Sequence, residues 1–241
     1  MSRPTTAMVL AAGLGTRMRP ITDTLPKPLV KIAGRTLLDR GLDALAGAGV
    51  NKAVVNTHHL GAMIAAHLDQ YSHLDIIISD ESELLLDSAG GIVKALPELG
   101  PDPFYILNAD TFWIDRDTPE LERLALMWDD TRMDILLMLA DPKNSTGHSG
   151  STDFLSDEEG RLSRGRNHPQ GLIYGGVGII HPRIFAGAKA APHSLNLYFD
   201  RAIAAGRLFG LAMKGHWITV GTPDAILPAE AAILTFSSQT A

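Results

Sequence analysis

The chain has 241 residues, of which 45% are hydrophobic, and it contains no cysteine. This length and composition fit a globular chain with a substantial core, and they exclude disorder, disulfide bonds and thiolate zinc sites. The formal net charge of −6 excludes the basic surface typical of nucleic-acid-binding proteins. Residues 1–6 are too short and polar for a signal peptide, and no apolar run reaches membrane-spanning length, so we expect a cytoplasmic protein without a membrane partner.

Predicted strands alternate with predicted helices in the first half of the chain. The expected strands are 7–11, 52–57, 75–79 and 104–108, and the expected helices are 37–48, 60–69 and 90–96. Such alternation is typical of an α/β fold with a mostly parallel sheet and helices on both faces. Ligands bind such sheets at the carboxyl ends of the strands, close to a switch in strand order.

The second half of the chain has a different pattern. We expect a strand at 134–140, a polar loop at 143–151, a hairpin formed by 154–155 and 161–163, a glycine-rich strand at 172–180, and helices at 196–205 and 223–236. No internal repeat or linker interrupts the sequence. We therefore expect a single domain over residues 1–241.

The segment after the first predicted strand carries the strongest functional signal. Gly13 and Gly15 permit a tight turn and a close approach of the backbone to a ligand. The amides around Thr16 can bind anionic oxygens, and Arg17 and Lys27 add two cations suited to phosphate. Neither a P-loop nor a dinucleotide-binding fingerprint has this glycine spacing. The segment therefore predicts a polyphosphate site of another class.

Asp110 follows the strand predicted at 104–108, within the sequence Asn108-Ala109-Asp110. A carboxylate at the end of a buried strand can bind Mg²⁺ while bound phosphates supply further oxygens. A capping role before Thr111 is the alternative.

The segment 10–28 resembles the signature of the sugar-1-phosphate nucleotidyltransferases, Leu-x-x-Gly-x-Gly-Thr-Arg-x-x-Pro-Leu-Thr-x-x-x-Pro-Lys-Pro. Ile21 replaces the leucine, and the matching residues are Gly13, Gly15, Thr16, Arg17, Pro20, Thr22, Pro26, Lys27 and Pro28. The resemblance implies a three-layer, Rossmann-like (GT-A-like) fold with a mixed, mostly parallel sheet. It also implies a nucleotide-binding half over about 1–110 and a sugar-phosphate half over about 111–241.

The resemblance further implies a role for each candidate residue. Arg17 would stabilise the departing pyrophosphate, Lys27 would bridge the α-phosphate and the sugar phosphate, and Asp110 would hold Mg²⁺. The nucleotide-binding residues would be Ala12, Gly13, Gly15, Thr16, Arg17, Lys27, Glu81, Ala89 and Gly90, and the sugar-phosphate-binding residues would be Asn108, Asp153 and Gly175. For Glu81 and Asp87, a solvated loop is the alternative interpretation.

The sequence departs from the family pattern at two places. Thr219 stands where the family motif Trp-x-Asp-x-Gly-Thr has its second metal-binding carboxylate. A hydroxyl is a weaker Mg²⁺ ligand, so we expect weaker metal binding. The Glu-Lys-Pro segment of relatives, whose lysine neutralises the sugar phosphate, is replaced by residues 163–167, where an arginine is the candidate substitute.

The resemblance is greatest with short family members that transfer a uridylyl group from UTP to N-acetylmuramic acid α-1-phosphate in peptidoglycan recycling. Transfer from GTP to mannose 1-phosphate is the alternative substrate pair. A weakly active sensor of nucleotide or sugar is a third interpretation, favoured by Thr219. We expect a monomer or homodimer. Two other features, the pair His58-His59 and Trp217, are interpreted as a loop pair and a core residue.

Overall fold

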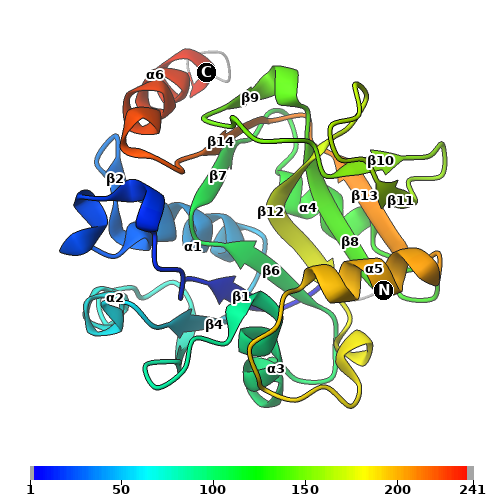
Figure 1. The fold of residues 1–241 in the computed structure, drawn as a ribbon, viewed down its shortest axis with the longest axis horizontal. Helices are drawn as coiled ribbons and strands as arrows, with labels where there is room; N and C mark the ends of the chain where they lie inside the picture. The colour runs from blue at the N-terminus through cyan, green and yellow to red at the C-terminus, as the bar shows by residue number, and fades with distance from the viewer. Residues whose placement is uncertain (1–2, 238–241) are drawn as a thin grey trace.

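A seven-stranded sheet forms the centre of the protein in the computed structural model, which describes residues 3–237 (Figure 1). Its strand order is β13-β8-β12-β6-β1-β4-β5. β12 is antiparallel to both of its neighbours, and the other neighbouring pairs are parallel. The strands are β1 (Thr6–Leu10), β4 (Lys52–Thr57), β5 (Asp75–Asp80), β6 (Phe104–Asn108), β8 (Ile135–Ala140), β12 (Ile173–Ile180) and β13 (Leu208–Ala212).

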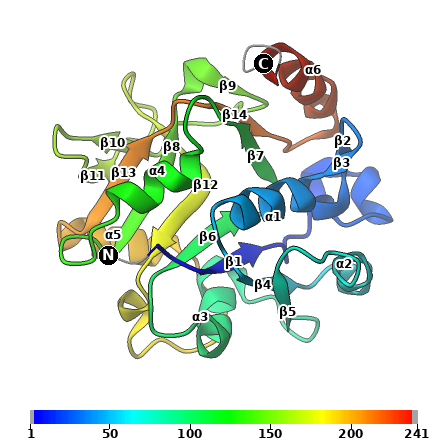
Figure 2. The same cartoon turned by 180° about the vertical axis from the view of Figure 1, so that it is seen from behind.

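Helices cover both faces of this sheet (Figures 1 and 2). Residues of α1 (Leu37–Gly47), α2 (Gly61–Leu68) and α4 (Glu120–Met127) share one buried cluster with Ala7 and Val9 of β1. Residues of α3 (Asp87–Leu99) and α5 (Asn196–Ala204) share the opposite cluster with Met8. Successive side chains of a strand point to opposite faces, so β1 contributes to both cores. The predicted three-layer α/β architecture is confirmed.

A smaller sheet and the last helix lie beyond one end of the central sheet (Figure 1). Its strand order is β7-β14-β9, with β7 (Thr111–Ile114), β14 (His216–Thr219) and β9 (Ser145–Thr146). α6 (Ile226–Ser237) packs against it in a third cluster that includes Ile218, Ala229 and Ala232. Two hairpins complete the strands: β2 (Lys31–Ile32) with β3 (Arg35–Thr36), and β10 (Phe154–Ser156) with β11 (Leu162–Arg164).

The structure corrects several predicted elements. The helix expected at 90–96 begins three residues earlier and extends to Leu99. The polar loop expected at 143–151 contains β9, which pairs with β14. The helix expected at 223–236 begins as a 3-10 turn, Pro223–Ala225, before α6. Sequence patterns did not identify β7, α4, β13 or β14.

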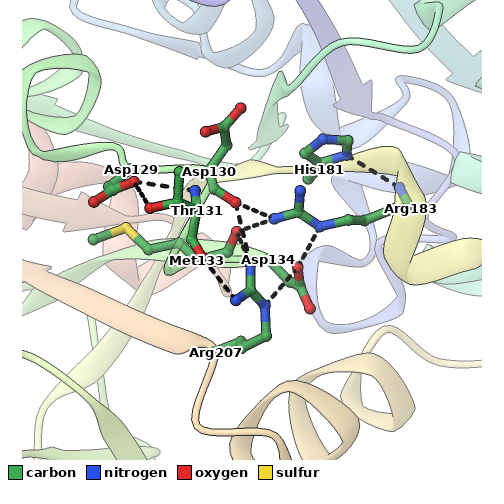
Figure 3. A network of polar contacts seen from close by, with 8 residues as sticks. All are labelled: Asp129, Asp130, Thr131, Met133, Asp134, His181, Arg183 and Arg207. Atoms are coloured by element: carbon green, nitrogen blue, oxygen red, sulfur yellow. Dashed lines mark hydrogen bonds and ion pairs between the residues drawn. The ribbon is translucent and has the colours of Figure 1, made fainter. Parts of the chain in front are cut away.

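An ion-pair network joins three strand ends at one edge of the sheet (Figure 3). Asp134, just before β8, accepts a 2.6 Å hydrogen bond from Nε of Arg183 and lies 3.0 Å from Nε of Arg207. Both arginines also donate to backbone carbonyls of Asp130 and Met133. The network therefore fixes the segment that enters β8 to the segments around β12 and β13.

The strand order reverses at β1, and this reversal positions the site. From β1 the chain passes to β4 and β5 on one side, and then returns to β6 on the other side. Leu10 and Asn108 pair at the carboxyl ends of β1 and β6. A crevice at such a switch point is where open α/β sheets bind ligands. Within residues 3–237, no helix is both long enough and apolar enough to span a membrane.

Candidate active site

The glycine loop, residues 11–19, follows β1 and contains a 3-10 turn at Thr16–Met18. Gly15 has a φ of +62°, and a side chain there would come within 3.0 Å of Thr22 and 3.1 Å of Lys27. The hydroxyl of Thr22 donates to the Gly15 carbonyl at 2.9 Å and holds the turn. Both backbone conformation and space therefore favour glycine at this position.

Backbone amides of the glycine loop are available for a ligand. Between residues 3 and 237, the N–H groups of Gly13, Leu14 and Gly15 donate to no protein acceptor. Two residues before Gly13, Ala11 N–H donates to the side-chain oxygen of Asn56 at 2.8 Å. Free amides that follow an anchored strand end form a binding surface for anionic oxygens.

A cavity of about 400 Å³, here called the first cavity, lies over this loop. It is open to solvent, and its lining combines the free amides of the glycine loop with the cations of Arg17 and Lys27 and the carboxylates of Asp87 and Asp110. Its lining residues are Leu10, Ala11, Ala12, Gly13, Gly15, Thr16, Arg17, Lys27, Pro28, Asn56, Leu85, Asp87, Ser88, Asn108, Ala109, Asp110 and Gly221.

Lys27 and Asp110 form an ion pair across the first cavity. Nζ of Lys27 lies 2.6 Å from Oδ2 of Asp110, and the lysine side chain is 10% exposed while the aspartate side chain is 36% exposed. A buried cation without a counter-ion is costly, so the pair stabilises the lysine in this position. The structure thus unites two residues that the sequence marks for phosphate and metal binding.

Arg17 lies at the rim of the first cavity. Its side chain is exposed, and it forms no ion pair with any residue that the structure describes. A side chain at Gly221 would come within 3.5 Å of its Nη1 atom, so the loop after β14 borders the guanidinium. Arg17 therefore presents free donors to a ligand in the cavity.

The donor set around Asp110 fits one hard cation bound jointly with a ligand. Residues 3–237 contain no cluster of three or more acidic or histidine side chains suited to a metal. Oδ1 of Asp110 accepts no hydrogen bond from the described residues, whereas Oδ2 binds Lys27. Mg²⁺ in nucleotide sites is commonly held by one or two carboxylates plus phosphate oxygens and water. The Asp110 carboxylate, beside the free amides of the glycine loop, meets that requirement.

Thr219 lies on the strand next to this carboxylate but outside the cavity lining. It pairs with Thr111 in the β7–β14 ladder, and Val220 N–H donates to the Asp110 carbonyl at 3.4 Å. The expected second metal position is therefore close to Asp110 along the backbone. Its role as a metal ligand stays a prediction.

The three residues expected near the nucleobase, Glu81, Ala89 and Gly90, do not line the first cavity. Glu81 is 2% exposed, and its carboxylate accepts hydrogen bonds from Asn56 at 2.7 Å and from Leu86 N–H at 2.9 Å. The amides of Ala89 and Gly90 both donate to the carbonyl of His193. The solvated-loop alternative for Glu81 is wrong, because the carboxylate is buried beneath the Asn56 side chain that anchors the glycine loop.

A second cavity of about 210 Å³ adjoins the first. The two share Leu10, Ser88 and Asn108, which form the wall between them. The remaining lining residues of the second cavity are Asp153, Phe154, Arg164, Tyr174, Leu195, Asn196 and Phe199. Asn108 and Asp153, both expected to bind the sugar, therefore line this space.

Gly175, also expected to bind the sugar, does not line the second cavity. Its carbonyl accepts hydrogen bonds from Trp217 Nε1 at 3.0 Å and Thr111 Oγ1 at 3.2 Å. A β-bulge interrupts the β12 register between Tyr174 and Gly178, and Gly176 there has a φ of +77°. Bulges commonly redirect a side chain next to a site, and Tyr174 lines the second cavity.

Tyr174 is a candidate that the sequence patterns did not identify. Its hydroxyl is buried and has no hydrogen-bond partner among the described residues. Burial raises the pKa of the Tyr174 hydroxyl, as do the charges of Asp110 and Asp153. The group therefore stays protonated and can donate to a ligand. A tyrosine next to a glycine cluster in a predicted strand was the available signal.

Other residues singled out in the sequence have structural roles. His58 and His59 bind the backbone carbonyls of Glu81 and Thr22, so they are a loop pair as expected. Trp217 is 3% exposed and belongs to a buried cluster, which confirms its assignment to the core.

Comparisons with known proteins identify relatives of this chain. A family model described as Nucleotidyl transferase matches residues 6–147. The chain is 42% identical over 235 residues to the N-acetylmuramate alpha-1-phosphate uridylyltransferase of Caulobacter vibrioides, covering 95% of this chain and 96% of that protein. It is 34% identical over 228 residues to the protein of the same name from Neisseria meningitidis, with coverages of 93% and 96%. Identity with the mannose-1-phosphate guanyltransferase of Aspergillus fumigatus is 29%, over 95% of this chain and 64% of that protein.

A solved structure supports the fold assignment. The inositol-1-phosphate CTP transferase from T. maritima matches with a TM-score of 0.77, covering 99% of this chain and 97% of that chain. The sequence identity is 17%, so the likeness concerns the arrangement of the chain in space.

Proposed function

The chain belongs to the nucleotidyl transferase family, and on that basis we propose that it transfers a uridylyl group from UTP to N-acetylmuramic acid α-1-phosphate. The products are the UDP-sugar and pyrophosphate, and the reaction belongs to peptidoglycan recycling in the cytoplasm. Transfer of a nucleotide to a sugar 1-phosphate is the activity of the family. The uridylyl and muramyl preferences rest on the two relatives that carry that name.

The observation that carries the proposal is the Lys27–Asp110 pair beside the free amides of the glycine loop. A triphosphate needs amide donors and cations, and the incoming sugar phosphate needs a cation that both phosphates can share. Lys27 is fixed by its 2.6 Å contact to Asp110 in the cavity that the loop amides also line. Two anions that repel each other in water can meet beside such a fixed charge.

The proposed reaction needs no side-chain nucleophile. An oxygen of the sugar phosphate is already anionic at neutral pH, and it attacks the α-phosphorus in line as pyrophosphate departs. The amides of Gly13 and Gly15 and the hydroxyl of Thr16 would hold the triphosphate, with Ala12 at the base of the turn. Arg17, exposed at the rim, would stabilise the charge that develops on pyrophosphate.

Asp110 would hold Mg²⁺, since one of its carboxylate oxygens is free and the second contacts Lys27. When bound, the metal neutralises phosphate charge and orients the reacting groups. The sugar would extend from this point into the second cavity, where Asn108 and Asp153 lie. Gly175 and the network of Glu81, Ala89 and Gly90 would support these walls from behind.

Pyrophosphate release tests the proposal directly. Purified protein with Mg²⁺ is assayed with each of the four common nucleoside triphosphates against the 1-phosphates of N-acetylmuramate, mannose and glucose. Release confined to UTP with the muramate phosphate is the expected result. A preference for GTP with mannose 1-phosphate would keep the mechanism and replace the substrates. Nucleotide binding without turnover in any combination would favour a sensor and contradict the proposal.

A further inference from the structure

Arg164 makes several directional contacts at the wall of the second cavity. Its Nε donates to Asp200 at 2.8 Å, and its Nη2 donates to the side chain of Asn196 at 3.0 Å. The guanidinium also lies over the ring of Phe154, 5.0 Å from the centroid, and 5.9 Å from that of Phe199. These contacts orient a planar cation before any ligand arrives.

The Arg164 guanidinium has N–H groups that no described residue accepts. A guanidinium has five N–H groups, and Nη1 of Arg164 donates to no described residue. Its ion pair with Asp200 is largely exposed, with side chains 39% and 61% accessible. Such an exposed pair is weak in water, so Arg164 can still bind a second anion while it contacts Asp200.

Arg164 lies apart from the phosphate-binding groups. It lines the second cavity only, whereas Arg17, Lys27 and Asp110 line the first cavity only. The phosphate of the acceptor must stay beside Lys27 to reach the α-phosphorus. A cation in the second cavity therefore faces another part of the acceptor sugar.

The remaining polar groups of the second cavity suit neutral parts of a sugar. Asp153 uses Oδ2 to accept Tyr174 N–H at 2.9 Å, and its Oδ1 accepts no hydrogen bond from the described residues. That oxygen can accept from a hydroxyl or an amide N–H. The unpartnered hydroxyl of Tyr174 can donate to an uncharged oxygen. Arg164 is the cationic residue that lines this cavity, so its matching ligand group is an anion.

We propose that Arg164 binds the carboxylate of the acceptor sugar and thereby selects a sugar acid over its neutral analogue. The proposal rests on the proposed function, because N-acetylmuramic acid differs from N-acetylglucosamine by a lactyl ether that ends in a carboxylate. Charged hydrogen bonds from an oriented guanidinium favour a carboxylate strongly over a neutral group. The arginine acts in binding and specificity and takes no part in bond formation.

The test compares three acceptors with UTP and Mg²⁺: N-acetylmuramate α-1-phosphate, its lactyl methyl ester, and N-acetylglucosamine α-1-phosphate. Arg164→Gln is expected to lower kcat/KM for the muramate phosphate about 10- to 100-fold, the loss of a charged hydrogen bond. It should leave kcat/KM for the ester and for the glucosamine phosphate unchanged. Arg201→Gln removes the same charge from an exposed position of α5, outside both cavity linings, and should change none of the three.

Two outcomes overturn the inference while the proposed function stands. Equal losses with all three acceptors would place Arg164 at the shared 1-phosphate, and no loss with any acceptor would leave it without a role. Wild-type protein that turns over none of the acceptors would instead contradict the proposed function. Calorimetry with N-acetylmuramate α-1-phosphate then still decides the inference. Binding to wild type that Arg164→Gln weakens at least 10-fold supports it, and equal binding or none overturns it.

Discussion

Nζ of Lys27 and Oδ2 of Asp110 lie 2.6 Å apart, although 83 positions separate the two residues in the sequence. The fold brings them together because Lys27 follows the glycine loop after β1 and Asp110 follows the adjacent parallel strand β6. Each charge is the counter-ion of the other in the free protein. Binding of a polyphosphate and a divalent cation would give each of them a new partner of opposite charge.

Lys27→Met should abolish most activity without unfolding the protein. Methionine keeps most of the side-chain volume, and the Asp110 left behind is 36% exposed and therefore solvated. Loss of a charge that stabilises the transition state typically lowers kcat about 10²- to 10³-fold. Steady-state pyrophosphate release measures the effect, and circular dichroism verifies the fold. Lys31→Met, at an exposed position of β2, is the control; comparable turnover in both variants would contradict the role of Lys27.

Thr219→Asp should lower the Mg²⁺ concentration needed for half-maximal rate. A carboxylate placed on β14 beside Asp110 would supply a stronger ligand than the threonine hydroxyl. Thr219→Val, which removes the hydroxyl at similar volume, is the companion variant. Magnesium titrations of the initial rate measure both. An unchanged or higher requirement in Thr219→Asp would show that this position does not reach the metal.

Tyr174→Phe should weaken acceptor binding without lowering stability. A buried hydroxyl without a partner costs about 1–3 kcal/mol, so its removal should leave the free energy of unfolding equal or higher. The KM for the sugar phosphate should rise about 2- to 12-fold, which corresponds to one hydrogen bond of about 0.5–1.5 kcal/mol. Tyr198→Phe is the matched control, because the Tyr198 hydroxyl binds His193 at 3.0 Å within the core. It should lower stability and leave KM unchanged; the reverse pattern would refute the assignment.

Asp134→Asn should destabilise the protein by about 1.5–3 kcal/mol at neutral pH, the range for a hydrogen bond to a charged group. Burial alone would raise the pKa of Asp134, but hydrogen bonds from Arg183 and Arg207 outweigh it and hold this pKa below its usual value. The stabilisation is therefore present above pH ~4, the unfolded pKa, and is lost as the pH falls through the lower folded pKa.

The free energies of unfolding of wild type and Asp134→Asn should consequently become similar at acidic pH. Urea denaturation at pH 7, 5 and 3 gives the free energies of unfolding, and the difference between wild type and Asp134→Asn should shrink toward pH 3. Asp130→Asn is the control, since the Asp130 side chain accepts no hydrogen bond from the described residues and lies outside the dashed network of Figure 3. A difference independent of pH would mean that the charge of Asp134 contributes nothing.

The sequence predicted the glycine loop and the strand ends well because these depend on local chemistry. Apolar runs bounded by turn residues identify buried strands, and the two glycines identify the turn after β1; the anion site that they and the two cations predict stays a prediction. The predicted bounds of β4 and β6 agree with the structure residue for residue. β9 and β14 were missed because they are short and exist through pairing with distant segments.

The second cavity was harder to predict from the sequence. Tyr174 lines it next to a bulge in β12, and Arg164 approaches it from a hairpin through contacts to α5. Both arrangements depend on register and on packing between elements far apart in the chain. Glu81 illustrates the same limit, since its burial beneath Asn56 follows from the pairing of β4 and β5.

Leu10, Ser88 and Asn108 line both cavities, so a ligand in either cavity would contact the same three residues. Any shift of these three side chains that accommodates one ligand also reshapes the space offered to the other. If nucleotide and sugar phosphate bind in these two cavities as proposed, their affinities would be coupled. The coupling would be reciprocal: the factor by which bound nucleotide changes the affinity for the sugar phosphate would equal the factor in the opposite direction. Under the proposed function, these three shared residues would therefore couple nucleotide binding to sugar-phosphate binding.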